Sequence, residues 1–108
     1  MKKVALLAVF WTFVGLSVAH ASVSLPVEGQ NLLTNKSVKA SVENKKGLVV
    51  VFLSAVCPCS NSHVAELTKI SNDYPDFNFI AVHSNANEEV AVAKNYFTDK
   101  KLPFPVIQ

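Results

Sequence analysis

The chain has 108 residues, with ten basic and eight acidic side chains and a formal net charge of +2 at pH 7. All ten basic residues are lysines, and no long basic run interrupts the sequence. This length predicts a single domain, and the lack of a basic patch argues against a nucleic-acid partner.

Residues 1–21 have the pattern of an export signal. A short positive segment (residues 1–3) precedes an apolar run (residues 4–18), and Ala-His-Ala at 19–21 supplies a small-x-small cleavage pattern. The run of about 15 apolar residues is shorter than the roughly 20 of a membrane-spanning helix. We therefore predict cleavage after Ala21, with an uncleaved anchor as the alternative. The mature domain would span residues 22–108, without a stable membrane span, in the periplasm or otherwise secreted, where disulfides persist.

The first part of the mature chain, residues 22–47, is polar and rich in turn-forming residues. It predicts a short hairpin or extended lead-in, followed by a helical or turn segment over residues 38–43. Residues 48–53 then form an apolar run, Leu-Val-Val-Val-Phe-Leu. Such a run predicts a strand covered on both faces, as in a parallel α/β sheet.

A helix is predicted to follow this strand. Pro58 suits the first turn of a helix, because proline has a fixed φ and lacks an N–H that would be unpaired there. One face repeats apolar residues at helical spacing, and Pro75 ends the pattern. The residues on this face are Val64, Leu67, Ile70 and Tyr74.

A second strand (residues 77–82) and a second helix complete the pattern. Asn85 and Glu88 predict a capping box, with Glu88 and Glu89 in the first turn of the helix and Lys100 and Lys101 in its last. The predicted inner face of this helix consists of Val90, Ala93 and Phe97. Alternating strands and helices predict an α/β fold built on a right-handed parallel βαβ unit.

The only two cysteines form a Cys57-Pro58-Cys59 tripeptide between the first strand and the first helix. A thiolate at a helix N-terminus is stabilised by the helix dipole, which makes Cys57 the better nucleophile. A purely structural disulfide across two residues would remove little entropy from the unfolded chain. The tripeptide therefore indicates thiol–disulfide chemistry.

The short spacing constrains how the two thiols can meet. Residues two apart in a helix are rotated by about 160°, whereas residues three apart are rotated by about 60°. A Cys57–Cys59 bond therefore requires Cys57 to stand outside the helix, and we expect a strained, easily reduced ring. Ser60 occupies the position of the second cysteine in a Cys-x-x-Cys motif. Either Cys59 resolves Cys57, or Cys57 pairs with the thiol of a partner.

The sequence resembles the thioredoxin fold, and more narrowly its redoxin branch of alkyl-hydroperoxide-reductase and thiol-specific-antioxidant-like proteins. The residues that carry this resemblance are 49–58 (Val-Val-Val-Phe-Leu-Ser-Ala-Val-Cys-Pro), 83–85 (His-Ser-Asn) and 102–106 (Leu-Pro-Phe-Pro-Val). It covers residues 48–108 well and residues 22–47 loosely. Redoxins continue with a further strand pair and a terminal helix, so we expect these elements to be missing here.

The resemblance implies a three-layer α/β fold with a central, mostly parallel sheet, and an oxidoreductase that needs no cofactor. Its partners would be protein thiols and disulfides, or a small thiol reductant. In that scheme Cys57 is the nucleophile and Cys59 the resolving thiol, with Ser54, Pro58 and Ser60 in support. The substrate, the reducing partner and the oligomeric state are not predicted.

Two other activities compete with disulfide exchange. Thiol peroxidases of this branch carry Pro-x-x-x-Thr/Ser-x-x-Cys, and here Ser54 and Cys57 match the pattern while Val50 replaces the proline. The supporting arginine of those enzymes has no counterpart, because the chain contains no arginine. We also expect the Ser54 hydroxyl to hydrogen-bond the Cys57 sulfur.

The second competing activity is Cu(I) binding. Cys57 and Cys59 would supply thiolates, His63 shares a helix face with Cys59, and His83 ends the neighbouring strand. Thiolate and imidazole ligands suit Cu(I).

Overall fold

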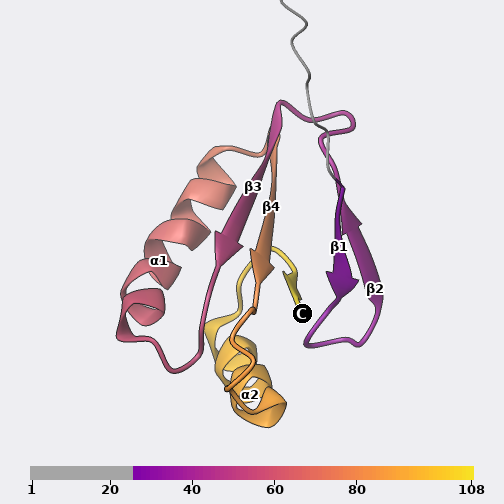
Figure 1. Cartoon of the computed structure of the whole chain (residues 1–108). Helices are drawn as coiled ribbons and strands as arrows, with labels where there is room; N and C mark the ends of the chain where they lie inside the picture. Colours follow the sequence, from indigo (N-terminus) through magenta and orange to yellow (C-terminus); the bar gives the residue numbers. More distant parts are fainter. Residues whose placement is uncertain (1–25) are drawn as a thin grey trace, which may run out of the picture.

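The computed structural model describes residues 26–108, so the predicted export signal of residues 1–21 lies outside the described residues. Within residues 26–108, no helix is long and apolar enough to cross a membrane. These residues form two sheets and two helices, arranged as Figure 1 shows.

The larger sheet has three parallel strands in the order β3-β4-β5. Strands β3 (Gly47–Phe52) and β4 (Phe77–Val82) are joined by helix α1 (Pro58–Asp73). Helix α2 (Val90–Lys100) joins β4 to the short strand β5 (Val106–Ile107). The predicted parallel α/β arrangement is confirmed.

The smaller sheet is a hairpin of β1 (Val27–Gln30) and β2 (Ser37–Ala40), and it lies beside β5 (Figure 1). The chain after β1 pairs with the end of the described range: the Leu32 N–H donates to the Val106 carbonyl at 2.8 Å. Gly29 permits this close approach, because a Cβ there would lie 2.8 Å from Cδ1 of Ile107.

The hairpin expected in residues 22–47 is therefore confirmed. Residues 38–40, for which a helix or turn was predicted, belong to β2 instead, and a turn follows. Alternation explains the difference, since Val38 and Ala40 face inward while Lys39 faces solvent, which is a strand period.

The hydrophobic core joins the hairpin loop, the larger sheet and helix α2. Phe97 of α2 is completely buried and packs edge-on against Tyr96 at 5.0 Å between ring centroids. The other buried members of this cluster come from the hairpin loop, the sheet, the end of β3, α2 and the segment before β5: Leu32, Leu53, Ala81, Ala93, Phe104 and Val106.

Two predicted faces are less covered than expected. Strand β3 was predicted to be covered on both faces, but Phe52 is 68% exposed and Val50 36% exposed. Val50 and Phe52 share one face of β3, and as an edge strand among the described residues β3 has a neighbouring strand on one side only, so its side chains have fewer neighbours. On α1, Val64 is buried, whereas the predicted apolar face becomes exposed toward Ile70 and Tyr74.

The start of the second helix was also predicted incorrectly. Helix α2 begins at Val90 with Glu89 as N-cap and has no acidic residue in its first turn. Val90 is 52% exposed and does not belong to the inner face, which Ala93 and Phe97 do form. Lys100 lies in the last turn as predicted, and Lys101 ends the helix in a left-handed conformation (φ 50°).

Candidate redox site

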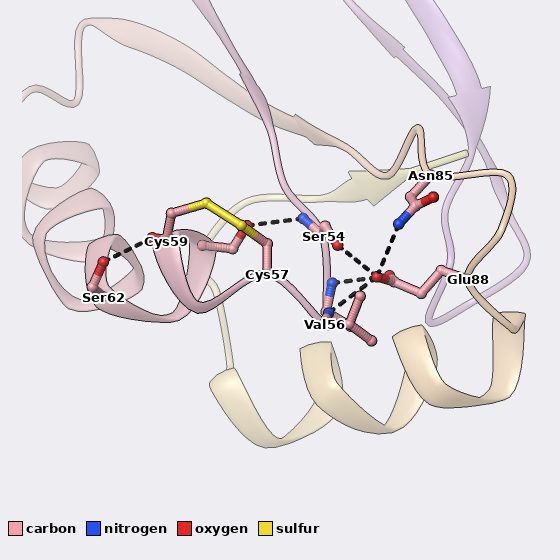
Figure 2. Close-up of a disulfide and its surroundings, with 9 residues drawn as sticks. Ser54, Val56, Cys57, Cys59, Ser62, Asn85 and Glu88 are labelled. Carbon is pink, nitrogen blue, oxygen red and sulfur yellow. Dashed lines mark hydrogen bonds between the residues drawn. A yellow bond between two sulfur atoms is a disulfide. The ribbon is translucent and has the colours of Figure 1, made fainter.

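Cys57 and Cys59 form a disulfide at the start of α1, with their Cα atoms 5.3 Å apart (Figure 2). Cys57 is the N-cap of the helix and has extended backbone angles (φ −82°, ψ 121°), while Pro58 is the first helical residue. Cys57 thus stands outside the helix, as the spacing required. Its carbonyl accepts hydrogen bonds from the Ser60 N–H at 3.1 Å and from the Asn61 N–H at 3.4 Å.

The helix terminus favours a thiolate when the disulfide is reduced. A side chain at the N-cap faces the unpaired N–H groups of the first turn, and the dipole adds positive potential there. The first turn of α1 contains no acidic residue that would oppose this effect. Cys57 is half-buried and Cys59 is exposed, so both ends of the disulfide are near solvent.

Residues 54–57, here called the redox loop, connect β3 to α1. One anchor of this loop is Ser60, a buried residue of the first helical turn whose Oγ accepts a hydrogen bond from the Ser54 N–H at 3.0 Å. The Ser54 hydroxyl donates to Oε1 of Glu88 at 2.5 Å. The expected hydrogen bond from Ser54 to the Cys57 sulfur is therefore wrong in this oxidised form.

The second anchor of the redox loop is the carboxylate of Glu88, which lies across the loop from the disulfide in Figure 2. It accepts hydrogen bonds from the N–H groups of Ala55 at 2.9 Å and Val56 at 3.0 Å. Nε2 of His83 lies 2.5 Å from Oε2 of the same carboxylate. The side chains of Glu88 and His83 are 1% and 4% exposed.

The pKa of Glu88 reflects this environment. Burial by itself raises the pKa, but the hydrogen bonds from Ser54, Ala55, Val56 and His83 outweigh it and lower the pKa to about 2. The carboxylate is thus ionised at neutral pH, and Nε2 of His83 donates to it.

The local sequence pattern predicts a helix cap for Glu88 and does not indicate its contacts with the redox loop. Only part of the predicted capping pattern is present: Nδ2 of Asn85 lies 3.4 Å from Oε1 of Glu88, and Oδ1 of Asn85 accepts a hydrogen bond from the Asn87 N–H at 3.2 Å. Neither contact is one of the two reciprocal side-chain to backbone bonds of a capping box. A usable signal was present: Glu88 follows β4 closely, and parallel strands place their carboxyl ends at one sheet edge. Polar residues after β4 therefore belong near the redox loop, which follows β3.

An apolar groove of about 270 Å³ opens beside the disulfide, between β3 and α1. Cys59 forms part of its wall, so a bound molecule would lie next to a sulfur atom. The remaining wall is mostly aliphatic or aromatic and includes Phe52, Leu53, Leu67 and Ile70.

The four residues named for Cu(I) binding do not form one group. Both sulfurs belong to the disulfide, and the His83 ring contacts Glu88. His63 is exposed, with Nδ1 3.8 Å from Glu66. Between residues 26 and 108, no group of three or more His, Cys, Asp or Glu side chains could hold a metal ion.

No protein-family model and no curated protein sequence matches the chain. The chain does resemble several solved structures. A secreted disulfide oxidoreductase of Mycobacterium tuberculosis, homologous to Escherichia coli DsbE, is 16% identical with a TM-score of 0.61, over 75% of this chain and 58% of that one. The thioredoxin domain of a thiol-disulfide oxidoreductase from Bacteroides vulgatus is 22% identical with a TM-score of 0.62, over 84% and 64%.

StoA from Bacillus subtilis is 17% identical with a TM-score of 0.59, over 79% of this chain and 64% of that one. The chain therefore spans between 58% and 64% of the length of these three structures. At such identities the likeness concerns the fold alone, and it agrees with the parallel sheet and its helical connections. Residues 26–108 have the thioredoxin-like α/β fold.

Proposed function

We propose that the chain is an exported thiol–disulfide oxidoreductase of the redoxin type that works through Cys57 and Cys59. The observation that carries the proposal is the placement of this disulfide at the N-cap of α1, where β3 ends. Solvent reaches the pair, and a helix terminus stabilises the thiolate that forms on reduction. The leader pattern of residues 1–21 supports export, and a disulfide persists in an oxidising compartment.

The exchange takes place in two balanced steps. The Cys57 thiolate attacks a substrate disulfide, a mixed disulfide forms, and one substrate sulfur leaves as a thiolate. The Cys59 thiolate then attacks Sγ of Cys57, which releases the second substrate thiolate and closes the Cys57–Cys59 bond. Two electrons pass to the substrate, and a dithiol or small thiol reductant restores the enzyme. The reverse sequence oxidises a substrate dithiol.

Single cysteine variants test these roles. We expect Cys57→Ser to abolish the acceleration of insulin reduction by a dithiol, because it removes the attacking sulfur. Cys59→Ser should retain the first step and accumulate mixed disulfides, which non-reducing electrophoresis detects. The matched control is Ser62→Ala, an exposed residue of α1 whose hydroxyl only contacts the Cys59 carbonyl. Full exchange activity in Cys57→Ser would contradict the mechanism.

A redox titration separates exchange from copper binding. We expect a reversible two-electron transition of the protein against glutathione that added Cu(I) does not shift. The short Cys-x-Cys spacing predicts a potential in the range of oxidising thiol proteins. Thiols that never pair but hold one Cu(I) tightly would instead establish a metal carrier.

A further inference from the structure

Three consecutive residues of the redox loop donate hydrogen bonds to the single carboxylate of Glu88. Oε1 accepts from the Ser54 hydroxyl at 2.5 Å and the Val56 N–H at 3.0 Å. Oε2 accepts from the Ala55 N–H at 2.9 Å and from His83 at 2.5 Å. Both oxygens are therefore occupied, and most of their donors belong to the segment immediately before Cys57.

The hydrogen bonds of Glu88 do not serve to cap helix α2. Glu88 lies outside that helix, whose N-cap is Glu89. Burial of a carboxylate is unfavourable unless hydrogen bonds replace its hydration. The N–H groups of Ala55 and Val56 likewise need partners, since they lie between strand and helix, outside the backbone pairing of both. The carboxylate and the loop thus satisfy each other, 32 to 34 residues apart in sequence.

The redox loop is held from two sides. On the helix side, Oγ of Ser60 accepts from the Ser54 N–H at 3.0 Å. On the opposite side Glu88 holds residues 54–56, and the His83 ring, stacked edge-on to Phe97 at 6.2 Å between ring centroids, holds the carboxylate. Cys57 follows Val56 directly, so the position of the N-cap depends on the hydrogen bonds that Glu88 makes with residues 54–56, here called the Glu88 clamp.

We propose that Glu88 is the positioning residue of the Cys57–Cys59 couple, and that His83 orients its carboxylate. The inference rests on the proposed function. Reduction opens the ring that joins Cys57 to Cys59, and the Glu88 hydrogen bonds then keep Cys57 at the helix terminus, where Cys59 can meet it again. Glu88 touches no sulfur and takes no part in the bond exchange itself.

Loss of the Glu88 clamp should shift the equilibrium between the Cys57–Cys59 disulfide and its reduced form toward the dithiol. With a looser loop the two thiols meet less often, which disfavours ring closure. Removal of the negative charge behind the loop also favours the Cys57 thiolate. Both effects have the same sign, so we expect the equilibrium with glutathione to move about tenfold, or about 30 mV for a two-electron couple.

The test compares Glu88→Gln with Glu89→Gln in the full chain. Both variants exchange a carboxylate for an amide at adjacent positions, but the Glu89 residue is exposed and forms no capping hydrogen bond. Glutamine at 88 places an NH₂ group against donors of the loop. We expect amide hydrogen exchange at Ala55 and Val56 to accelerate by about 10–100-fold in Glu88→Gln. Glu89→Gln should leave both the amides and the glutathione equilibrium unchanged.

The two readouts separate the possible results. Faster amide exchange with an unchanged glutathione equilibrium would reduce Glu88 to a structural role and overturn the proposal. Unchanged amide exchange would overturn it as well. If Glu88→Gln does not fold, Ser54→Ala removes one donor, keeps the carboxylate, and should shift both readouts in the same direction by less. Amide exchange needs no substrate, so a wild-type protein without exchange activity would refute the proposed function alone.

Discussion

Replacement of Phe97 by alanine is expected to lower the free energy of unfolding by about 3–5 kcal/mol. The Phe97 ring is completely buried and belongs to the core cluster that joins the hairpin, the sheet and α2. Alanine would leave a cavity in addition to the lost transfer energy, because the neighbouring backbone relaxes only partly. The variant would also remove the ring that packs against His83, which holds Glu88.

Urea denaturation of Phe97→Ala and Phe52→Ala provides the measurement and its matched control. Phe52 carries the same side chain, but 68% of its surface is exposed, so its truncation should cost less than about 1 kcal/mol. Equal urea midpoints for the two variants would contradict the structure, because they would show that the core does not depend on the Phe97 ring of α2.

The second large effect concerns acid. The pKa of Glu88 is lowered to about 2 in the folded protein, against 4.5 in the unfolded chain. A lowered folded pKa contributes stability that is complete above the unfolded value and is lost as the pH falls through the folded value. We expect Glu88 to contribute about 3 kcal/mol above pH 5.5, which disappears between that pH and about 2.

Unfolding by urea at a series of pH values from 6 to 2 tests this linkage. Two titratable groups face the Glu88 carboxylate: His83, which contacts it, and Tyr96, whose pKa is raised first by burial and then by the charge of Glu88. Glu88→Gln should lose less stability than the wild type over this range, whereas Glu89→Gln should follow the wild type. If Glu88→Gln loses as much stability as the wild type between pH 6 and 2, a carboxylate other than Glu88 causes the loss of stability in acid.

The parallel βαβ unit was predictable because its signals are local. The apolar run at residues 48–53 and the repeat of Val64 and Leu67 have the periods of a buried strand and a helix face. Pro58 and the two cysteines define a helix start at the end of a strand, and their spacing alone required Cys57 to stand outside the helix.

The role of Glu88 was not predictable in the same way. Asn85 and Glu88 match a local capping pattern, yet the carboxylate binds backbone groups that are more than 30 residues away. Local capping competes with a tertiary partner, and the sequence alone does not show which donors are unpaired in space. The exposure of Phe52 also depends on which strands surround β3, a property of the whole sheet.

The pairing of the hairpin with β5 has a consequence for the order in which the protein forms. Leu32 and Gln30 donate to Val106 and Gln108, at opposite ends of the described range. A ribosome adds roughly 5–20 residues per second, so several seconds separate the synthesis of these partners. An isolated two-stranded hairpin is only marginally stable. We therefore expect the β1–β2 hairpin to become stable only after β5 has been synthesised and has paired with it. This late pairing should determine how fast the nascent chain becomes resistant to proteases.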